Sequence, residues 1–242
     1  MGISRVWQTT HTICGADGAL VIDGPVTRAE QLALASHCAA AQLITTHADW
    51  DHLLAPLAFP DATRIADAAT IGRLESDHTV VADALAAWDA SHAFPARRLP
   101  DWRGAQPISA PTTISSPIGR IEVSPTPGHT RDGIALLLIE QEVLVLGDYL
   151  SPCEIPSVAS DAQLDTYLAS LERLEDLLTR SRCVIPGHGW PLGAARARTI
   201  LSEDRHYVIS LNAGRPAPVP RHRADGLQQA QHRGNLTAAR AR

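Results

Sequence analysis

The sequence contains no lysine, few cysteines and few aromatic residues. All 21 basic residues are arginine, four residues are cysteine, and aromatic side chains make up 4% of the chain. The cysteines show no paired spacing, and the N-terminus lacks the basic-then-apolar order of a secretory signal, so we expect free thiols in a reducing cytoplasm. Long apolar runs are absent too, because the run at 134–139 is far below the roughly 20 residues of a membrane-spanning helix. These absences predict a soluble, cytoplasmic protein with no membrane partner.

The chain of 242 residues, 45% of them hydrophobic, fits one compact domain, which we predict over residues 1–211. The remaining segment, 212–242, holds six arginines against one aspartate, although the whole chain carries a net charge of −5. A basic tail can bind nucleic acid. This tail has no aromatic residue to stack on bases, so we favour a solvated arm or a terminal helix on its own acidic body. The oligomeric state stays open.

Short β-like runs alternate with helical patterns along the chain. Thr27, followed by Glu30, predicts a capped helix over 27–41, and regularly spaced leucines predict another helix over 160–180. A further helix is expected from about Ala194 to Leu211. Strands are predicted over 5–10, 19–23, 42–46 and 183–186 and within 119–128, and residues 61–74 are predicted to form a strand followed by the start of a helix. A hairpin is predicted over 133–148 that turns at Glu140 and Gln141. Strands that each lead into a polar turn and then a helix are typical of an α/β layered sandwich.

Candidate metal ligands follow four of these strands directly. In an extended segment, the side chains at 47, 49 and 51 point to one side. The glycines before His129 and His188 would allow a tight turn that directs each imidazole back toward a cleft. Neutral imidazole and carboxylate suit zinc, iron or manganese, and seven ligands are too many for one ion. The seven are His47, Asp49, Asp51, His52, His129, Asp148 and His188.

The motifs THADWDH, PTPGHT, LGD and PGHG, preceded by DGALVIDGP, resemble the metallo-β-lactamase superfamily, in particular its dinuclear hydrolases similar to glyoxalase II and the lactonases. The resemblance covers about residues 6–211 and implies a four-layer αββα sandwich with two divalent metal ions. Zinc is the metal that we expect ahead of the others. It implies that His47 and His129 bind one metal, that Asp51, His52 and His188 bind the other, and that Asp148 bridges them together with a water or hydroxide. Asp51 and Asp148 are then the catalytic carboxylates.

Asp49 departs from the family pattern, which has histidine at this position. A third carboxylate lowers the net charge of a dinuclear site by about one unit, so a bridging water should be less acidic. The site also has more oxygen ligands, so iron and manganese are alternatives to zinc as the bound metal. Aspartate is shorter than the glutamate that the flavodiiron relatives carry here. Asp49 could therefore ligate directly or act from outside the ligand set.

The function that we predict is metal-dependent hydrolysis, in which a metal-bound water or hydroxide attacks an ester-like bond of a small molecule: a lactone, ester or thioester. One alternative is an iron-dependent oxidoreductase of the persulfide dioxygenase or flavodiiron type. Another is a protein that binds or processes nucleic acid through its basic tail.

The segment 77–101 is a predicted lid insertion that could govern substrate choice. Its side chains could form an apolar wall with an anion clamp, or they could pack the segment onto the body. Trp50, within the ligand loop, could face substrate or support the site, and Cys153 is expected to be a small buried thiol. The candidate substrate-binding residues are Trp50, Trp88, His92, Phe94, Arg97 and Arg98.

Overall fold

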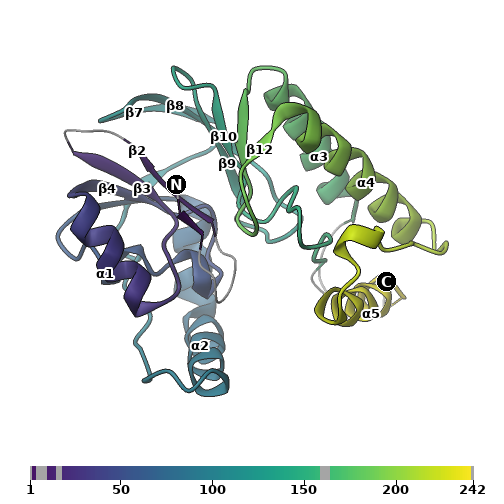
Figure 1. Cartoon of the computed structure of the whole chain (residues 1–242), viewed down its shortest axis with the longest axis horizontal. Coiled ribbons are helices and arrows are strands. Elements are labelled where there is room, and N and C mark those ends of the chain that lie inside the picture. The colour runs from purple at the N-terminus through teal and green to yellow at the C-terminus, as the bar shows by residue number, and fades with distance from the viewer. Residues whose placement is uncertain (1, 4–9, 15–17, 159–163, 241–242) are drawn as a thin grey trace. The chain divides into compact units, whose positions relative to one another are not determined.

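The structure is a computed structural model that describes residues 2–3, 10–14, 18–158 and 164–240. The chain divides into two compact units, Met1–Ile121 and Glu122–Arg242. In the described ranges, the chain forms two six-stranded sheets and five α-helices (Figure 1). The boundary between a domain at 1–211 and a tail at 212–242 stays a prediction. No helix in these ranges is both long enough and apolar enough to cross a membrane.

The first sheet has the strand order β1-β2-β3-β4-β5-β6, and its strands from β3 to β6 run parallel. Helices α1 and α2 accompany it (Figure 1). The bounds are β1 Gly2–Ile3, β2 Thr10–Cys14, β3 Ala19–Ile22, α1 Arg28–His37, β4 Ala40–Ile44, η1 Trp50–His52, η2 Ala55–Leu57, β5 Thr63–Asp67, α2 Ala68–Ser91 and β6 Gln106–Ile108. The strand predicted over 5–10 lies, apart from its last residue, outside the described residues.

Local sequence explains how α1 begins. The Thr27 side chain accepts from the backbone N–H of Glu30 at 3.3 Å, and the Glu30 carboxylate accepts from the N–H of Thr27 at 3.4 Å. These reciprocal bonds satisfy two amide groups that have no partner within the helix, so the predicted capping box is confirmed. The helix ends at His37, earlier than predicted, because residues 40–44 join the parallel sheet as β4.

The second sheet has the order β12-β11-β10-β9-β8-β7, and helices α3, α4 and α5 lie in the second half of the chain (Figure 1). The predicted hairpin is confirmed, since β9 and β10 pair antiparallel with Val143 opposite Leu138. The bounds are β7 Thr112–Ser116, β8 Gly119–Pro125, β9 Ile134–Leu138, β10 Val143–Val145, α3 Leu164–Leu178, β11 Cys183–Ile185, β12 Leu192–Gly193, α4 Ala194–Asn212, η3 Arg221–Arg223 and α5 Gly226–Arg240.

The leucine stripe of α3 anchors the core of the second unit. Of the six leucines in the helix predicted over 160–180, Leu168 is partly exposed. The other five are buried in one cluster with residues of β9, β10 and α4: Leu164, Leu171, Leu174, Leu177 and Leu178. Strands β10 and β11 run parallel, so their carboxyl ends meet at one edge, where Gly187 N–H donates to Gly147 O at 2.6 Å. This pairing brings the residues that follow the two strands, Asp148 and His188, to the same place.

Candidate functional site

The first cluster, His47, Asp49, Asp51 and His52, lies in the loop that follows β4. This loop is short because the Thr45 hydroxyl lies 2.8 Å from the carbonyl of His47 and 3.2 Å from that of His52. The 3-10 turn η1 then begins at Trp50 and carries Asp51 and His52. Both histidines and Asp51 are buried, and Asp49 is about one-third exposed. The predicted gathering of these four residues is therefore present within the first unit.

One buried carboxylate, Asp23, fixes the orientation of both histidines. Asp23 Oδ2 lies 2.8 Å from His52 Nδ1 and accepts from the Thr46 hydroxyl at 2.9 Å. Because the hydroxyl gives its single proton to Asp23, it can only accept from His47 Nδ1, which lies 3.0 Å away. Carboxylate and hydroxyl thus hold the protons on Nδ1 of both imidazoles. The Nε2 lone pairs are then the ones available to a metal ion.

The Nε2 atoms of this cluster face carboxylate oxygens at distances that suit shared ligation. His47 Nε2 lies 3.5 Å from Asp49 Oδ2, and His52 Nε2 lies 3.6 Å from Asp51 Oδ2. Two ligand atoms each about 2.1 Å from one ion, at a tetrahedral angle, are about 3.4 Å apart. The donor set and its spacing therefore fit a divalent metal ion.

Asp49 has a partner that the sequence motif does not contain. Arg73, on α2, donates from Nη2 to Asp49 Oδ1 at 2.5 Å, while the other oxygen faces His47. The Arg73 and Asp49 side chains are 17% and 30% exposed, so the ion pair is only partly screened by water. The extra negative charge at position 49 is thus offset by an adjacent guanidinium.

The second cluster, His129, Asp148 and His188, lies in three loops of the second unit. Asp148 Oδ2 lies 3.2 Å from His129 Nε2 and 3.3 Å from His188 Nε2. One carboxylate oxygen therefore faces two imidazoles at ligand spacing. Glu154, which was not predicted, lies near them, with Oε2 at 4.0 Å from His188 Nε2.

Gly128 aims His129 through a backbone conformation that other residues rarely adopt. Its φ is +136°, and a Cβ atom there would lie 2.6 Å from Tyr167 Cα and 2.8 Å from Tyr149 Oη. The Tyr149 hydroxyl donates to Pro127 O at 3.0 Å and accepts from His129 N–H at 3.2 Å. The predicted glycine turn before His129 is confirmed. Burial raises the pKa of the Tyr149 phenol, so it stays a neutral donor.

At His188, the left-handed glycine follows the histidine instead of preceding it. Gly189 has φ +106°, and its Cβ would come within 2.5 Å of Pro152 Cγ, whereas Gly187 does not adopt a positive φ. Gly187 instead donates to Gly147 O, as described above. The chain does bend at Gly187, so a turn before His188 is present without a positive φ at this glycine; that the turn directs the imidazole toward a cleft stays a prediction.

A backbone carbonyl sets the tautomer of His129. Its Nδ1 lies 3.3 Å from Ser157 O, and since a carbonyl oxygen only accepts, the proton lies on Nδ1. Nε2 then carries the lone pair that faces Asp148. The second cluster thus also fits a divalent ion by its donor set and spacing.

In the segment 77–101, α2 continues to Ser91 and the following loop folds back on it. Asp89 is buried and binds the guanidinium of Arg97, with Nη2 at 2.5 Å from Oδ1, and accepts from the Arg97 backbone N–H at 3.0 Å. This arginine is therefore held by a carboxylate, while Arg98 is exposed. An anion clamp at Arg97 would have to compete with Asp89.

Aromatic side chains of this segment stack on one another. Trp88 is buried, with ring centroids of His92 at 4.3 Å, Phe94 at 5.2 Å and Trp50 at 5.1 Å. Trp88 thus links the ligand loop to α2 within the first unit. These contacts support the packing alternative for Trp88 and Phe94. A substrate-facing role for Trp50, His92 and Arg98 stays a prediction.

Cys153, expected to be a buried thiol, is half-buried. Burial raises the pKa of its thiol to about 11, and its Sγ lies 3.3 Å from Ser151 Oγ.

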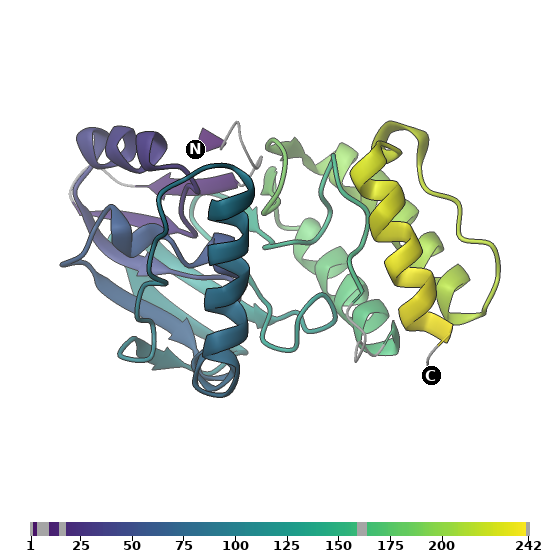
Figure 2. The ribbon, with the colours of Figure 1, turned by 90° about the horizontal axis from the view of Figure 1, so that it is seen from below.

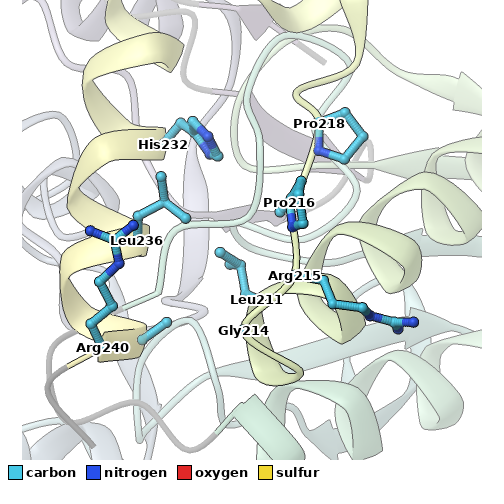
Figure 3. A pocket seen from close by; sticks show the side chains of 10 residues that line it. Leu211, Gly214, Arg215, Pro216, Pro218, His232, Leu236 and Arg240 are labelled. Atoms are coloured by element: carbon cyan, nitrogen blue, oxygen red, sulfur yellow. The ribbon is translucent and has the colours of Figure 1, made fainter.

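A cavity of about 500 Å³ lies elsewhere in the second unit, and its walls contain none of the predicted site residues (Figure 3). Its lining residues are Leu211, Gly214, Arg215, Pro216, Ala217, Pro218, His232, Leu236, Ala239 and Arg240.

Sequence reasoning missed Asp23, Arg73, Tyr149, Glu154 and Ser157. The strand-end position of Asp23, in VIDG, is a usable signal, because the candidate metal ligands are also polar residues that directly follow buried strands. The others carry no local signal, since each contacts its partner across at least 20 residues of sequence.

The family model described as the metallo-beta-lactamase superfamily matches residues 42–188, more than half of the chain. No curated protein sequence matches. Among solved structures, the fold resembles the stereoselective inverting sec-alkylsulfatase Pisa1 from Pseudomonas sp., with a TM-score of 0.71 and 16% identity over 97% of this chain and 47% of that one. The chain thus spans about half of the sulfatase's length.

Two further solved structures are similar over most of their own length. An archaeal metallo-beta-lactamase superfamily protein from Sulfolobus tokodaii has a TM-score of 0.68 and 17% identity, covering 97% of this chain and 93% of its own. A metallo-beta-lactamase family protein from Thermus thermophilus has a TM-score of 0.63 and 24% identity, covering 85% and 77%. The predicted fold class, the αββα metallo-β-lactamase sandwich, is confirmed. This chain belongs to the metallo-β-lactamase superfamily.

Proposed function

We propose that this protein is a metal-dependent hydrolase in which the two clusters together supply the ligands of two divalent ions. His47, Asp49 and His129 would hold one ion, Asp51, His52 and His188 the other, and Asp148 would contribute to both. The observation that carries the proposal is the common geometry of the clusters. In each, imidazole Nε2 atoms face carboxylate oxygens at 3.2–3.6 Å, and the tautomers of His47, His52 and His129 leave an Nε2 lone pair for a metal ion.

When bound, the ions would supply Lewis-acid polarisation of the scissile group and a lowered pKa for the attacking water. The chain's own residues hold the geometry for this chemistry. Asp23 and Ser157 keep the proton on Nδ1 of three histidines, so that no Nε2 proton occupies a ligand position. Asp51 and Asp148 provide carboxylate oxygens that can accept hydrogen bonds from water and orient it.

The substrate class that we propose is a small molecule with a lactone, ester or thioester bond. Attack by water is favoured over nucleophilic attack by Cys153. The raised pKa of this thiol leaves little thiolate, which is the nucleophilic form, near neutral pH. Sulfate esters belong in the same test, since the similar fold of Pisa1 is described as a sec-alkylsulfatase.

The test is a panel of lactones, carboxylic esters, thioesters and alkyl sulfates, assayed with protein loaded separately with zinc, manganese and ferrous iron. We expect turnover of at least one class, its loss on adding a chelator, and loss of more than about 10²-fold in an Asp148→Asn variant. Absence of turnover on every class by protein that holds two metal equivalents would contradict hydrolysis.

The second candidate is an iron-dependent oxidoreductase, which Asp49 favours. Its Oδ2, facing His47 Nε2, offers an oxygen ligand where the family has an imidazole. The discriminating measurement is metal content after purification without added metal, compared between wild type and Asp49→His. Iron in the wild type and zinc in the variant would support the oxidoreductase, whereas tightly bound zinc in both would exclude it.

A further inference from the structure

Helix α5 lies in the C-terminal segment that the sequence predicted to be a basic arm or a terminal helix, and two of its three buried side chains are polar. Gln228 and Asn235 are buried and Gln231 is half-buried. The spacing of three and then four residues places the three on one face of the helix. Helix α5 packs against α4 and is seen along its length in Figure 2. A polar buried face needs hydrogen-bonding partners, because burial without them is costly.

The partners of this face are backbone groups and one side-chain hydroxyl of residues 155–158, in the loop that follows Asp148. Gln228 Oε1 accepts from Ile155 N–H at 2.8 Å, and Gln231 Nε2 donates to Ser157 Oγ at 3.1 Å. Asn235 makes two such bonds, donating to Pro156 O at 2.7 Å and accepting from Val158 N–H at 3.0 Å. The helix therefore replaces backbone pairing that this loop lacks in any sheet.

Asn235 holds the residues on both sides of Ser157, whose carbonyl sets the tautomer of His129. The side chain of Asn235 is wholly buried, and its Nδ2 also donates to Tyr207 Oη at 3.0 Å, which fixes the orientation of the amide. Arg223 secures the start of the same loop, donating to Glu154 O at 2.8 Å and pairing with Asp204 at 2.6 Å. An uninterrupted series of bonds thus leads from the C-terminal segment to His129.

We infer that α5 is a positioning element of the second cluster, and that Asn235 is its principal positioning residue, acting through the Ser157 carbonyl on the imidazole of His129. Other residues of α5, His232 and Leu236, point toward the cavity in Figure 3, so the helix contacts the core through one side and lines that cavity with another. As a statement about the His129 tautomer, the inference stands apart from the proposed function; its effect on metal affinity rests on that function.

The test compares Asn235→Ala with wild type by two-bond ¹H–¹⁵N NMR of the imidazoles in metal-free protein at about pH 8.5, where an ordinary histidine is neutral. The His129 signals are assigned with His129→Gln. Wild type should show the Nδ1–H tautomer at His129, and the variant a mixture of tautomers. Thr237→Ala, on the exposed face of the same helix, is the control and should match wild type.

The second readout is affinity for Zn²⁺ by chelator competition, together with the electronic spectrum of the Co²⁺-loaded protein. We expect Asn235→Ala to lose about tenfold in affinity and to change the cobalt spectrum. An unchanged His129 tautomer in folded Asn235→Ala would overturn the inference. A changed tautomer with unchanged metal affinity would uphold the positioning role and count against the proposed metal function instead.

Should Asn235→Ala fail to fold, the milder Gln231→Ala serves in the same measurements. It removes the bond to Ser157 Oγ and the 2.9 Å bond to Asn235 Oδ1, and leaves the two Asn235 bonds to the loop backbone in place. A smaller shift of the tautomer in the same direction is expected, and no shift would overturn the inference.

Discussion

The two clusters obtain the same imidazole tautomer by different means. In the first, His47 and His52 lie within one short loop, and a single buried side chain, Asp23, serves both through direct and hydroxyl-mediated bonds. In the second, His129 depends on a backbone carbonyl, and that carbonyl depends on a helix almost 80 residues further along the chain. A contiguous ligand motif can be ordered by one local carboxylate. Ligands from three separate loops need support from the tertiary structure.

The largest effect should come from breaking the turn that aims His129. Gly128→Ala places a Cβ at positive φ and within 2.6 Å of Tyr167 Cα. We expect a loss of more than about 3 kcal/mol in the free energy of unfolding, because strain and overpacking add. Urea denaturation measures it. Gly72→Ala, in α2 with open space around its Cβ, is the control and should be neutral or stabilising. Equal stability of the two variants would contradict the close packing at Gly128.

The next largest effect concerns Asp23, the single carboxylate that orients the first cluster. Asn tolerates the positive φ of 54° at this position, but Asp23→Asn can place an amide donor where Oδ2 accepted from His52 Nδ1. Zinc affinity should fall about 10–100-fold, measured by chelator competition. Asp61→Asn, at an exposed aspartate, should leave affinity unchanged. Full affinity in folded Asp23→Asn would mean that the first cluster does not depend on this carboxylate.

A smaller effect is expected at the ion pair of Asp49 and Arg73. A double-mutant cycle with Asp49→Asn and Arg73→Gln, in metal-free protein, should give a coupling of about 0.5–1 kcal/mol in the free energy of unfolding, because both groups are only partly exposed. The matched control is the exposed pair of Asp101 and Arg103, for which we expect weaker coupling. Equal coupling in the two cycles would remove Arg73 as a specific partner of Asp49.

The smallest effect is expected at Cys153, whose Sγ lies 3.3 Å from Ser151 Oγ in the second unit. Because burial raises the thiol pKa to about 11, alkylation by iodoacetamide at neutral pH should be slow and should accelerate as the pH approaches that value. Cys153→Ser should retain zinc affinity within about twofold. Mass spectrometry of the labelled peptide measures the rate, and rapid labelling at neutral pH would contradict the raised pKa of the thiol.

Much of the fold could be predicted because its signals are local. The capping box at Thr27, the hairpin through Glu140 and Gln141 and the leucine stripe of α3 each depend on residues a few positions apart, where helix and strand periodicity applies. The end of α1 was placed too late. Residues 40–44 form β4 instead, because pairing within the sheet outweighs the helix propensity of these residues.

Sequence by itself determined the family of this protein and the loops that carry its candidate ligands. The reason is that each of these loops follows a strand directly and holds its histidine and aspartate residues in a short, contiguous motif. Only the tertiary structure decided which groups orient those side chains: Asp23 at His52, Arg73 at Asp49, and Asn235 behind Ser157 and His129. The physical reason is the range of the interaction. A side-chain hydrogen bond requires donor and acceptor atoms within about 3 Å in space but no fixed spacing in sequence. A periodic sequence pattern therefore cannot predict it.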